Sequence, residues 1–392
     1  MKRVVIGLSG GVDSSVAAYL LKKQGYEVIA LFMINWHDRT GTLTGQCTWE
    51  DDALIAEMVA KKLDIPFHVV DLSKYYKQRV VDYMFDEYSK GRTPNPDVLC
   101  NREIKFDIFM DECMKHNADF VATGHYCQKS EFVKNEQMIY QLQAGADNNK
   151  DQSYFLCQLN QHQLSKALFP IGHLQKPEVR QIAAEQSLPT ATRKDSQGIC
   201  FVGKVDLPTF LQQQLEAKTG NVIEIPTSFI AKKKSIEKTP DNFKKLCFEF
   251  PYKPWNGKVI GEHRGAHFYT IGQRKGLNIG GHEKPLFVLA TDVIRNIIYV
   301  GEGSEHPGLY RYGLFMESNE VHWVREDLKM EVGEERAYDL RIRYRQPLER
   351  AKLYCREEGT YILFEKEQRG ITSGQFAAWY KEGELIGSGT IK

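Results

Sequence analysis

A short glycine- and serine-rich segment near the start of the chain constrains its fold more than any other feature. Residues 9–15 read Ser-Gly-Gly-Val-Asp-Ser-Ser and lie between the β-branched run 3–8 and apolar residues that recur at helical spacing from Val12 to Leu21. A strand, a glycine turn and a helix in this order direct backbone N–H groups and serine hydroxyls at an anion. The segment lacks the lysine of the G-x-x-x-x-G-K-[ST] pattern, which argues against an ordinary kinase or GTPase. It therefore predicts a phosphate-binding loop, with a capped strand–helix turn as the alternative.

The first part of the chain alternates apolar runs with stretches of helical periodicity. The predicted strands are 3–8, 27–33, 67–70 and 120–122, and the predicted helices are the segment after residue 12, then about 50–63, 75–90 and 102–116. Gly25 and Gly91 follow two of these helices, as stop signals do. This β-α-β alternation predicts an open parallel sheet with helices on both faces, so the predicted fold class is α/β.

The pattern changes near residue 205, where short runs separated by Gly and Pro replace the helical periodicity. Such runs occur at 286–289, 297–300, 361–364 and 376–380, and they predict β-barrel or sandwich modules. We expect three domains: a catalytic domain over 1–205, a small middle domain over 206–285 and a C-terminal β-barrel over 286–392.

Composition limits the class of protein. A chain of 392 residues with 42% hydrophobic and 26% charged residues is typical of soluble globular proteins. The net charge of +1 does not indicate a polyanionic partner, so a nucleic-acid surface has to come from local basic clusters. No run approaches the roughly 18 apolar residues of a membrane span, and the N-terminus has no cleavable signal. We expect a cytoplasmic protein that contacts no membrane.

The eight cysteines are scattered along the chain, at positions 47, 100, 113, 127, 157, 200, 247 and 355. None forms a C-x-x-C pair, so no zinc site or thioredoxin-type motif is predicted and no metal ligand is assigned. Cys100 follows the constrained segment Asn95-Pro96-Asp97, and a helix predicted to begin near Asn101 would lower the pKa of its thiol. Asp97 can serve in proton transfer. A rigid proline-rich loop with an incidental cysteine is the alternative.

Two more segments contain candidate site residues. Cys200 lies in a second glycine-containing loop, 195–203, and two candidate thiolates suit sulfur transfer, which needs a donor persulfide and a resolving thiol. Gly124 and His125 follow the predicted strand 120–122, at the edge where parallel sheets bind nucleotides. For His125, a structural histidine satisfied by its neighbours is an equal alternative.

These segments resemble known families. Residues 9–15 resemble the pyrophosphate-binding loop of the N-type ATP pyrophosphatases, which include GMP synthetase, NAD synthetase, argininosuccinate synthetase and the tRNA thiolases. The resemblance implies cleavage of ATP to AMP and pyrophosphate, with Asp13 near the magnesium. Over nearly its whole length the chain resembles the tRNA-specific 2-thiouridylases, in the segments 31–33, 91–106, 124–126, 150–156, 195–203, 271–277, 343–346 and 372–375.

The resemblance to the thiouridylases implies a role for each motif. ATP, with Mg²⁺, is held by Gly7, Leu8, Ser9, Gly10, Gly11, Val12, Asp13, Ser14, Met33 and Gly124. Cys200 receives sulfur as a persulfide, and Cys100 is the partner nucleophile that can close a transient disulfide with it. Asn95, Pro96 and Asp97 approach the target base. The tRNA is contacted by His125, Lys150, Asp151, Gln152, Arg343, Tyr344 and Gln375.

The implied reaction is adenylation of the 2-oxygen of the wobble uridine and its replacement by sulfur, giving 2-thiouridine and AMP. Cys100 either releases free sulfide from the persulfide or resolves the linkage afterwards, and the sequence leaves both routes open. The implied partners are tRNAs with wobble-uridine anticodons, of the Lys, Glu and Gln acceptors. A cysteine desulfurase or relay protein would supply the persulfide, since no rhodanese-like domain is apparent.

Two basic segments have uncertain roles. Near 227–255 the chain has more residues than the family pattern, including Lys232–Lys234 and Lys244–Lys245, which form either an exposed insertion or an extension of the tRNA footprint. Arg341, Arg343 and Arg345 alternate with period 2, so on a strand they share one face at a spacing suited to phosphates. Pairing of these arginines with local acidic residues is an equal alternative.

Two other functions compete with tRNA thiolation. An ATP-dependent amidotransferase or ligase on a small molecule is disfavoured because the loop begins at residue 9, which leaves no room for a preceding glutaminase domain. A non-catalytic RNA-binding or sulfur-carrier module is disfavoured by the intact loop and both cysteines.

Overall fold

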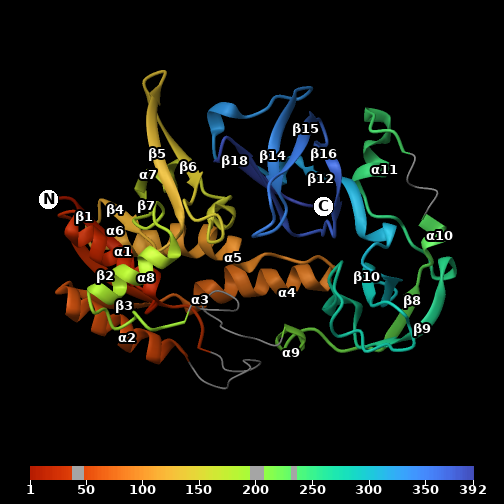
Figure 1. Ribbon diagram of the computed structural model, residues 1–392, viewed down its shortest axis with the longest axis horizontal. Coiled ribbons are helices and arrows are strands. Elements are labelled where there is room, and N and C mark those ends of the chain that lie inside the picture. The colour runs from red at the N-terminus through yellow and green to blue at the C-terminus, as the bar shows by residue number, and fades with distance from the viewer. Residues whose placement is uncertain (38–47, 195–206, 231–235) are drawn as a thin grey trace.

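The computed structural model describes residues 1–37, 48–194, 207–230 and 236–392. Figure 1 shows the parallel sheet and its helices at one end, the middle domain at the other, and the C-terminal sheet alongside both. None of the described helices has the length and apolar character to cross a membrane.

The N-terminal sheet is parallel throughout, with the order β3-β2-β1-β4-β7. Its strands are β1 (Arg3–Gly7), β2 (Glu27–Ile34), β3 (Phe67–Asp71), β4 (Phe120–Ala122) and β7 (Ala167–Leu168). Strands β1 and β2 are almost continuously apolar because both faces of the sheet are covered. One face packs on α1 (Val12–Lys23), α2 (Thr48–Leu63) and α8 (Lys176–Glu185), and the other on the helices between β3 and β4. The predicted α/β fold class is confirmed.

The helices between β3 and β4 form two long segments. The first comprises α3 (Ser73–Tyr76), the π-helix Lys77–Val81 and α4 (Asp82–Ser89). The second comprises α5 (Pro96–Leu99), the π-helix Cys100–Ile108 and α6 (Phe109–Lys115). The π-helix kinks at Phe106, whose carbonyl oxygen accepts a hydrogen bond of 2.8 Å from Gln163 Nε2. This side chain satisfies a backbone group that the kink frees.

The second segment begins earlier than predicted, so the expected start near Asn101 is wrong. Asn95 is the N-cap, and its side chain accepts a hydrogen bond of 3.2 Å from the Val98 amide. Pro96 occupies the first helical position, where its missing N–H costs nothing. Cys100 therefore lies one turn inside the helix, and its own N–H donates to the carbonyls of Pro96 and Asp97. The free N–H groups at the start of the helix lie around Asp97 and not at Cys100. The positive potential expected to lower the pKa of the Cys100 thiol is therefore centred near Asp97.

The middle sheet has the order β10-β11-β8-β9. Its strands are β8 (Gly220–Glu224), β9 (Lys258–His263), β10 (Leu286–Asp292) and β11 (Ile297–Glu302), and the helices of this part are α9 (Leu207–Leu211), α10 (Thr227–Ile230) and α11 (Phe243–Cys247). Strand β11 pairs with β8, and β10 pairs with β11, so this sheet continues past residue 285, where we expect the middle domain to end. Apolar runs predict strands, but they do not show which sheet each strand joins.

The C-terminal sheet has the order β12-β16-β15-β14-β17-β18-β6-β5, with β13 paired to β18. Its strands are β12 (Tyr310–Glu317), β13 (Val321–Trp323), β14 (Glu335–Arg341), β15 (Glu349–Arg356), β16 (Gly359–Arg369), β17 (Phe376–Lys381) and β18 (Glu384–Thr390). The hairpin of β5 (Cys127–Lys134) and β6 (Gln137–Ala144) precedes α7 (Gln161–Lys166) and belongs to the first 205 residues. The expected catalytic domain therefore contributes two strands to the C-terminal sheet.

The insertion near 227–255 is docked on the C-terminal sheet. In α11, Phe243, Leu246 and Cys247 are buried against residues of β12 and β16. Lys244 and Lys245 are exposed on the same helix, whereas Lys232–Lys234 lie outside the described residues. Helix α11 of the insertion is thus packed on the C-terminal sheet and has a basic outer face.

Candidate active site

The predicted phosphate loop connects β1 to α1 at the carboxyl edge of the parallel sheet. Gly11 is the N-cap of α1 and makes no side-chain cap, so the first N–H groups of the helix stay available to an anion. The Ser14 and Ser15 hydroxyls donate to the Gly11 carbonyl at 3.2 and 2.8 Å, and the Ser9 amide donates to Ser14 Oγ at 3.2 Å. These bonds fix the conformation of the loop at the start of α1.

Two glycines allow other elements to approach the loop closely. Gly10 has φ +72°, and a Cβ there would lie 2.5 Å from the Asp52 carbonyl oxygen of α2. A Cβ on Gly124, just after β4, would lie 2.7 Å from the Ser14 amide nitrogen. A Cβ on Gly7 would meet the Met33 methyl at 3.5 Å. The structure therefore brings together the residues predicted to hold ATP, namely Gly7, Leu8, Ser9, Gly10, Gly11, Val12, Asp13, Ser14, Met33 and Gly124.

Lys176, at the start of α8, is a site residue that the sequence reasoning missed. Its Nζ lies 2.7 and 2.9 Å from the two carboxylate oxygens of Asp13, and its side chain is only 10% exposed. Tyr126 donates to the same carboxylate at 2.7 Å. The loop has no lysine of its own, and a lysine about 160 residues later lies against its aspartate, a proximity that no local motif signals.

Arg193 is a second missed residue. Its guanidinium donates to the Gly10 carbonyl at 2.8 Å and to Asp52 Oδ1 at 2.7 Å, joining the phosphate loop to α2. Burial raises the pKa of the Asp52 carboxyl, although the bond from Arg193 opposes this shift.

The loop that precedes α5 is held by the C-terminal domain. Gln375 Nε2 donates to the Thr93 and Pro94 carbonyls at 2.8 and 3.2 Å, and the Thr93 amide donates to the Ser373 carbonyl at 2.8 Å. A cavity of about 250 Å³ adjoins this contact, lined by Lys90, Gly91, Arg92, Thr93, Glu249, Tyr269, Ile271, Thr291, Thr372, Ser373 and Lys392. Gln375 therefore positions the segment that contains Asn95, Pro96 and Asp97, which are all half-buried.

Of the two cysteines predicted to transfer sulfur, the structure describes Cys100 but not Cys200. Cys100 is fully buried and is not part of a disulfide, and it lies one helical turn after Pro96 and Asp97. Cys200 lies outside the described residues, so its pairing with Cys100 stays a prediction. Burial raises the thiol pKa of Cys113, Cys127, Cys157, Cys247 and Cys355, in the cases of Cys157 and Cys247 to about 12. These five thiols are protonated at neutral pH and are poor nucleophiles.

Asp151 and Gln152, predicted to contact tRNA, make internal bonds. The Asp151 side chain is 3% exposed, forms an ion pair of 3.1 Å with Arg341 of β14, and accepts from the Gly145 and Ser153 amides. Gln152 Oε1 accepts from the Tyr126 amide at 3.0 Å. Asp151 therefore joins the N-terminal domain to the C-terminal sheet, while Lys150 beside it is half-exposed.

The expectation that Arg341, Arg343 and Arg345 share one strand face is wrong. Strand β14 ends at Arg341, and Arg345 has φ +63°, so the alternation stops. Arg341 is buried against Asp151, and Arg343 donates to the Gly370 carbonyl. Tyr344 packs on Phe155 in a tilted arrangement, with ring centroids 4.4 Å apart. Arg341 therefore follows the alternative given in the sequence analysis, in which these arginines pair with acidic residues instead of binding phosphates.

His125 is 7% exposed and lies beside Phe106 and Phe169. Its Nδ1 is 2.7 Å from the Thr123 hydroxyl. Burial, with a smaller contribution from Lys105, lowers the pKa of His125 well below its usual value, so the imidazole is neutral at pH 7. In this structure His125 has the character of a satisfied core histidine.

We expect His125 to make the protein less stable in mild acid. The pKa of His125 is lower in the folded protein than its value of about 6.5 in the unfolded chain, so protonation favours the unfolded state. The free energy of unfolding is therefore highest above pH 6.5 and falls as the pH is lowered, by up to about 1.4 kcal/mol per pH unit. The melting temperature of His125→Asn should fall less between pH 7.5 and 5.5 than that of the wild type. The exposed His162→Asn is the matched control and should retain the wild-type slope. Equal slopes for all three proteins would contradict this assignment.

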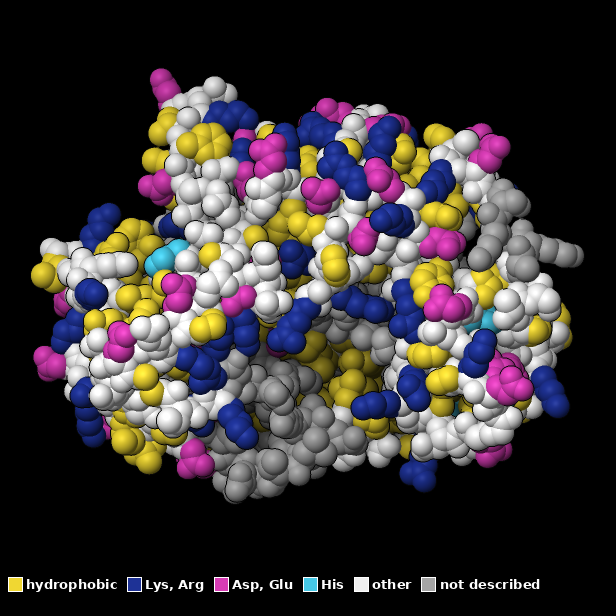
Figure 2. All heavy atoms as spheres, viewed as in Figure 1, with side chains coloured by type: hydrophobic (Ala, Val, Ile, Leu, Met, Phe, Trp, Pro, Cys, Tyr) yellow, Lys and Arg dark blue, Asp and Glu magenta, His cyan; other side chains and the backbone are white. Residues whose placement is uncertain are grey.

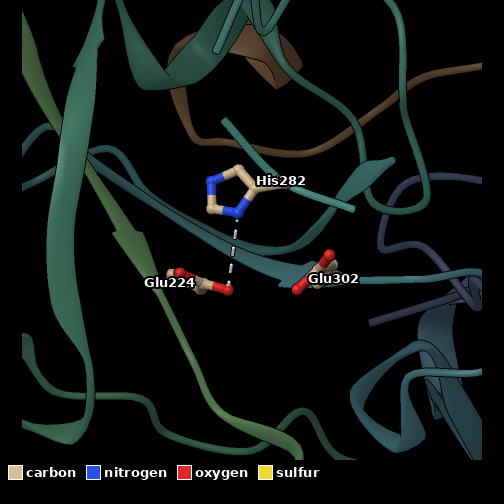
Figure 3. A group of neighbouring side chains, drawn as sticks. All are labelled: Glu224, His282 and Glu302. Atoms are coloured by element: carbon tan, nitrogen blue, oxygen red, sulfur yellow. Dashed lines mark ion pairs between the residues drawn. The ribbon is translucent and has the colours of Figure 1, made fainter. Parts of the chain in front are cut away.

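Glu224, His282 and Glu302 of the middle domain lie close together (Figure 3). One ligand atom from each lies within 4.8 Å of the others, and His282 Nδ1 is 4.0 Å from Glu224 Oε1. Glu302 also accepts a hydrogen bond of 2.7 Å from the Lys284 amide. No further feature of the described residues points to a bound ion at this group.

Comparison with known proteins assigns the family. A profile described as tRNA methyl transferase HUP domain matches residues 2–204, a tRNA methyl transferase PRC-barrel domain matches 251–302, and an aminomethyltransferase beta-barrel domain matches 315–391. The tRNA-specific 2-thiouridylases MnmA of Christiangramia forsetii and Flavobacterium johnsoniae are 61% and 59% identical over 394 residues, covering 100% of both chains in each case. That of Karelsulcia muelleri is 46% identical over 392 residues, covering 100% of this chain and 98% of that one.

The chain belongs to the tRNA-specific 2-thiouridylase family. This assignment confirms the resemblance derived from the sequence motifs. The first matched segment ends at residue 204, and the second begins at residue 251. The insertion near 227–255 begins in the stretch between them.

Proposed function

We propose that this protein is an ATP-dependent tRNA thiolase that replaces the 2-oxygen of the wobble uridine with sulfur from a persulfide. The main structural support is the phosphate loop at the carboxyl edge of the parallel sheet, with Lys176 beside it and the Asn95–Asp97 segment in the same domain. Figure 2 shows Lys and Arg side chains around a hollow in the middle of one face, and such a surface suits a phosphate backbone. We propose Lys150 and Gln375 as tRNA-side residues at this site.

In the first step the uridine must leave the anticodon stack to reach the nucleotide. Its 2-oxygen attacks the α-phosphorus of ATP, a new P–O bond forms, and pyrophosphate departs. The N–H groups at the start of α1 and the Lys176 ammonium stabilise the charge that develops on the phosphates. Mg²⁺ accompanying the nucleotide would add to this neutralisation.

In the second step sulfur attacks carbon 2 of the uracil, and the C–O bond breaks as AMP leaves with the former 2-oxygen. If the persulfide on Cys200 attacks directly, the Cys100 thiolate then attacks the Cys200 sulfur and frees the thiocarbonyl. If Cys100 acts first, the same attack releases hydrosulfide, which becomes the nucleophile. Both routes leave a Cys100–Cys200 disulfide, which an external dithiol must reduce.

Reconstitution tests this function. Purified protein, ATP, Mg²⁺, a persulfide-generating cysteine desulfurase, a dithiol and tRNAs with varied anticodons are combined, and AMP and 2-thiouridine are measured. We expect AMP and 2-thiouridine to appear together, only with wobble-uridine tRNAs. AMP formation on a small molecule without tRNA would instead support a ligase.

Gln375→Leu should lower kcat/KM for tRNA thiolation about 10-fold or more. The substitution keeps the side-chain volume but removes both hydrogen bonds to the Thr93–Pro94 backbone, and small displacements of positioning segments are costly. ATP affinity measured without tRNA should not change. The exposed Gln181→Leu on α8 is the control, and a fall in ATP affinity in Gln375→Leu would place its role elsewhere.

A further inference from the structure

Asn35 is an unexplained polar residue next to the nucleotide site. It directly follows β2 and is 2% exposed. Neither its amide nitrogen nor its amide oxygen has a hydrogen-bond partner within the described part of the chain. It is the one buried amide side chain among the described residues with both ends unpartnered.

Two buried glutamines among the described residues are satisfied at both ends of the amide, whereas Asn101 donates from Nδ2 and only its oxygen lacks a partner. Gln158 accepts from Arg102 and donates to Ser388, and Gln163 donates to the Phe106 carbonyl while its oxygen caps α7. A buried donor or acceptor without a partner costs stability, so native proteins rarely keep one that has no task. An apolar residue at position 35 would avoid this cost. The amide is therefore best explained by a partner that arrives with a ligand.

The position of Asn35 agrees with a ligand at the sheet edge. Gly7 at the end of β1 pairs with Leu31 of β2, and the Met33 side chain reaches Gly7. Asn35 thus lies at the carboxyl end of the strand beside the phosphate loop, where open parallel sheets bind nucleotides. Trp36 packs on Tyr76 and Phe210, with ring centroids 6.5 and 6.1 Å away, and so fixes the chain just after the amide.

We propose that the Asn35 carboxamide binds the edge of a nucleobase, an assignment that rests on the proposed function. A carboxamide presents an N–H donor beside a carbonyl acceptor, which complements the N7 acceptor and N6 amino group of adenine. The N3–H and neighbouring carbonyl of uracil offer the same complement. The base is thus either the adenine of ATP or the uracil to be modified, and Asn35 selects it by hydrogen bonding.

Asn35→Asp tests this assignment, because aspartate has the same shape but lacks the N–H donor. Wild-type protein is first shown to form AMP in a tRNA-dependent reaction, so that failure of the proposed function is seen separately. Affinities for ATP and 7-deaza-ATP are then measured without tRNA, followed by thiolation rates at varied tRNA concentration. Asn319→Asp, exposed in the C-terminal domain, is the matched control.

If Asn35 reads adenine, ATP affinity falls about 10- to 100-fold in Asn35→Asp. Wild-type protein then binds 7-deaza-ATP more weakly than ATP, whereas the variant shows a smaller difference. If Asn35 reads uracil, ATP affinity is unchanged and kcat/KM for tRNA falls by a similar factor. Affinities, base discrimination and tRNA kinetics all within twofold of wild type would overturn the proposal. A lower melting temperature with both base discrimination and kcat/KM for tRNA unchanged would also overturn it, since that indicates a structural role.

Discussion

Replacing either Cys100 or Cys200 by serine is expected to reduce 2-thiouridine formation at least 1000-fold. A serine hydroxyl can neither form a persulfide nor attack one, so the sulfur-transfer step has no substitute nucleophile. Formation of pyrophosphate from ATP should survive in both variants, because adenylation needs no thiol. Mass spectrometry of tRNA nucleosides and a pyrophosphate assay together separate the two steps.

The half-buried Cys355 of β15 is the matched control for these substitutions. Burial raises the pKa of its thiol, so Cys355→Ser should thiolate tRNA at the wild-type rate. Normal thiolation by Cys100→Ser or Cys200→Ser alone would remove that residue from the reaction. Loss of activity in Cys355→Ser would show that serine substitution acts through the fold.

Gly124→Ala is expected to reduce ATP turnover at least 100-fold. The new Cβ would lie 2.7 Å from the Ser14 amide nitrogen and 2.9 Å from the Asp13 carbonyl carbon. Both are backbone atoms at the start of α1, so the phosphate loop must shift to relieve the overlap. The loss should appear in ATP binding without tRNA, measured beside a melting curve that verifies folding.

Gly280→Ala provides the control for this substitution. Nothing lies within 4 Å of a Cβ at Gly280, and its φ is not in the left-handed region. It should bind ATP and form AMP like the wild type. Normal ATP binding by Gly124→Ala would show that the nucleotide does not bind at the 9–15 loop.

The parallel sheet and the phosphate loop were predictable because their signals are local. Strands β1 to β4 lie at the predicted apolar runs, and the glycines at positions 7, 10, 11 and 124 meet around the loop as expected. The helix start at Asn95 is also encoded locally, by an N-cap residue followed by a proline. Treating Pro96 as a constraint on a loop places the predicted helix start too late.

Long-range partners were not predictable from one sequence. Lys176 and Arg193 reach the loop from residues far along the chain, and nothing near them in sequence distinguishes them from surface cations. The period of Arg341, Arg343 and Arg345 suggested one exposed face, but the acceptor that removes Arg341 from that face is Asp151, about 190 residues earlier. Strand pairing likewise depends on tertiary contacts, which explains why the sequence does not show that β10 and β11 join the sheet of β8.

The pairing of the 127–144 hairpin with the C-terminal sheet has a consequence for synthesis on the ribosome. Strand β6 emerges early, but the strand it pairs with, β18, begins at Glu384, some 240 residues later. At about 5–20 residues per second the nascent chain carries a bare strand edge for roughly 12–48 s. Proteolytic removal of the last 70 residues would therefore leave a fragment in which the edge of β6 is open and can template aggregation.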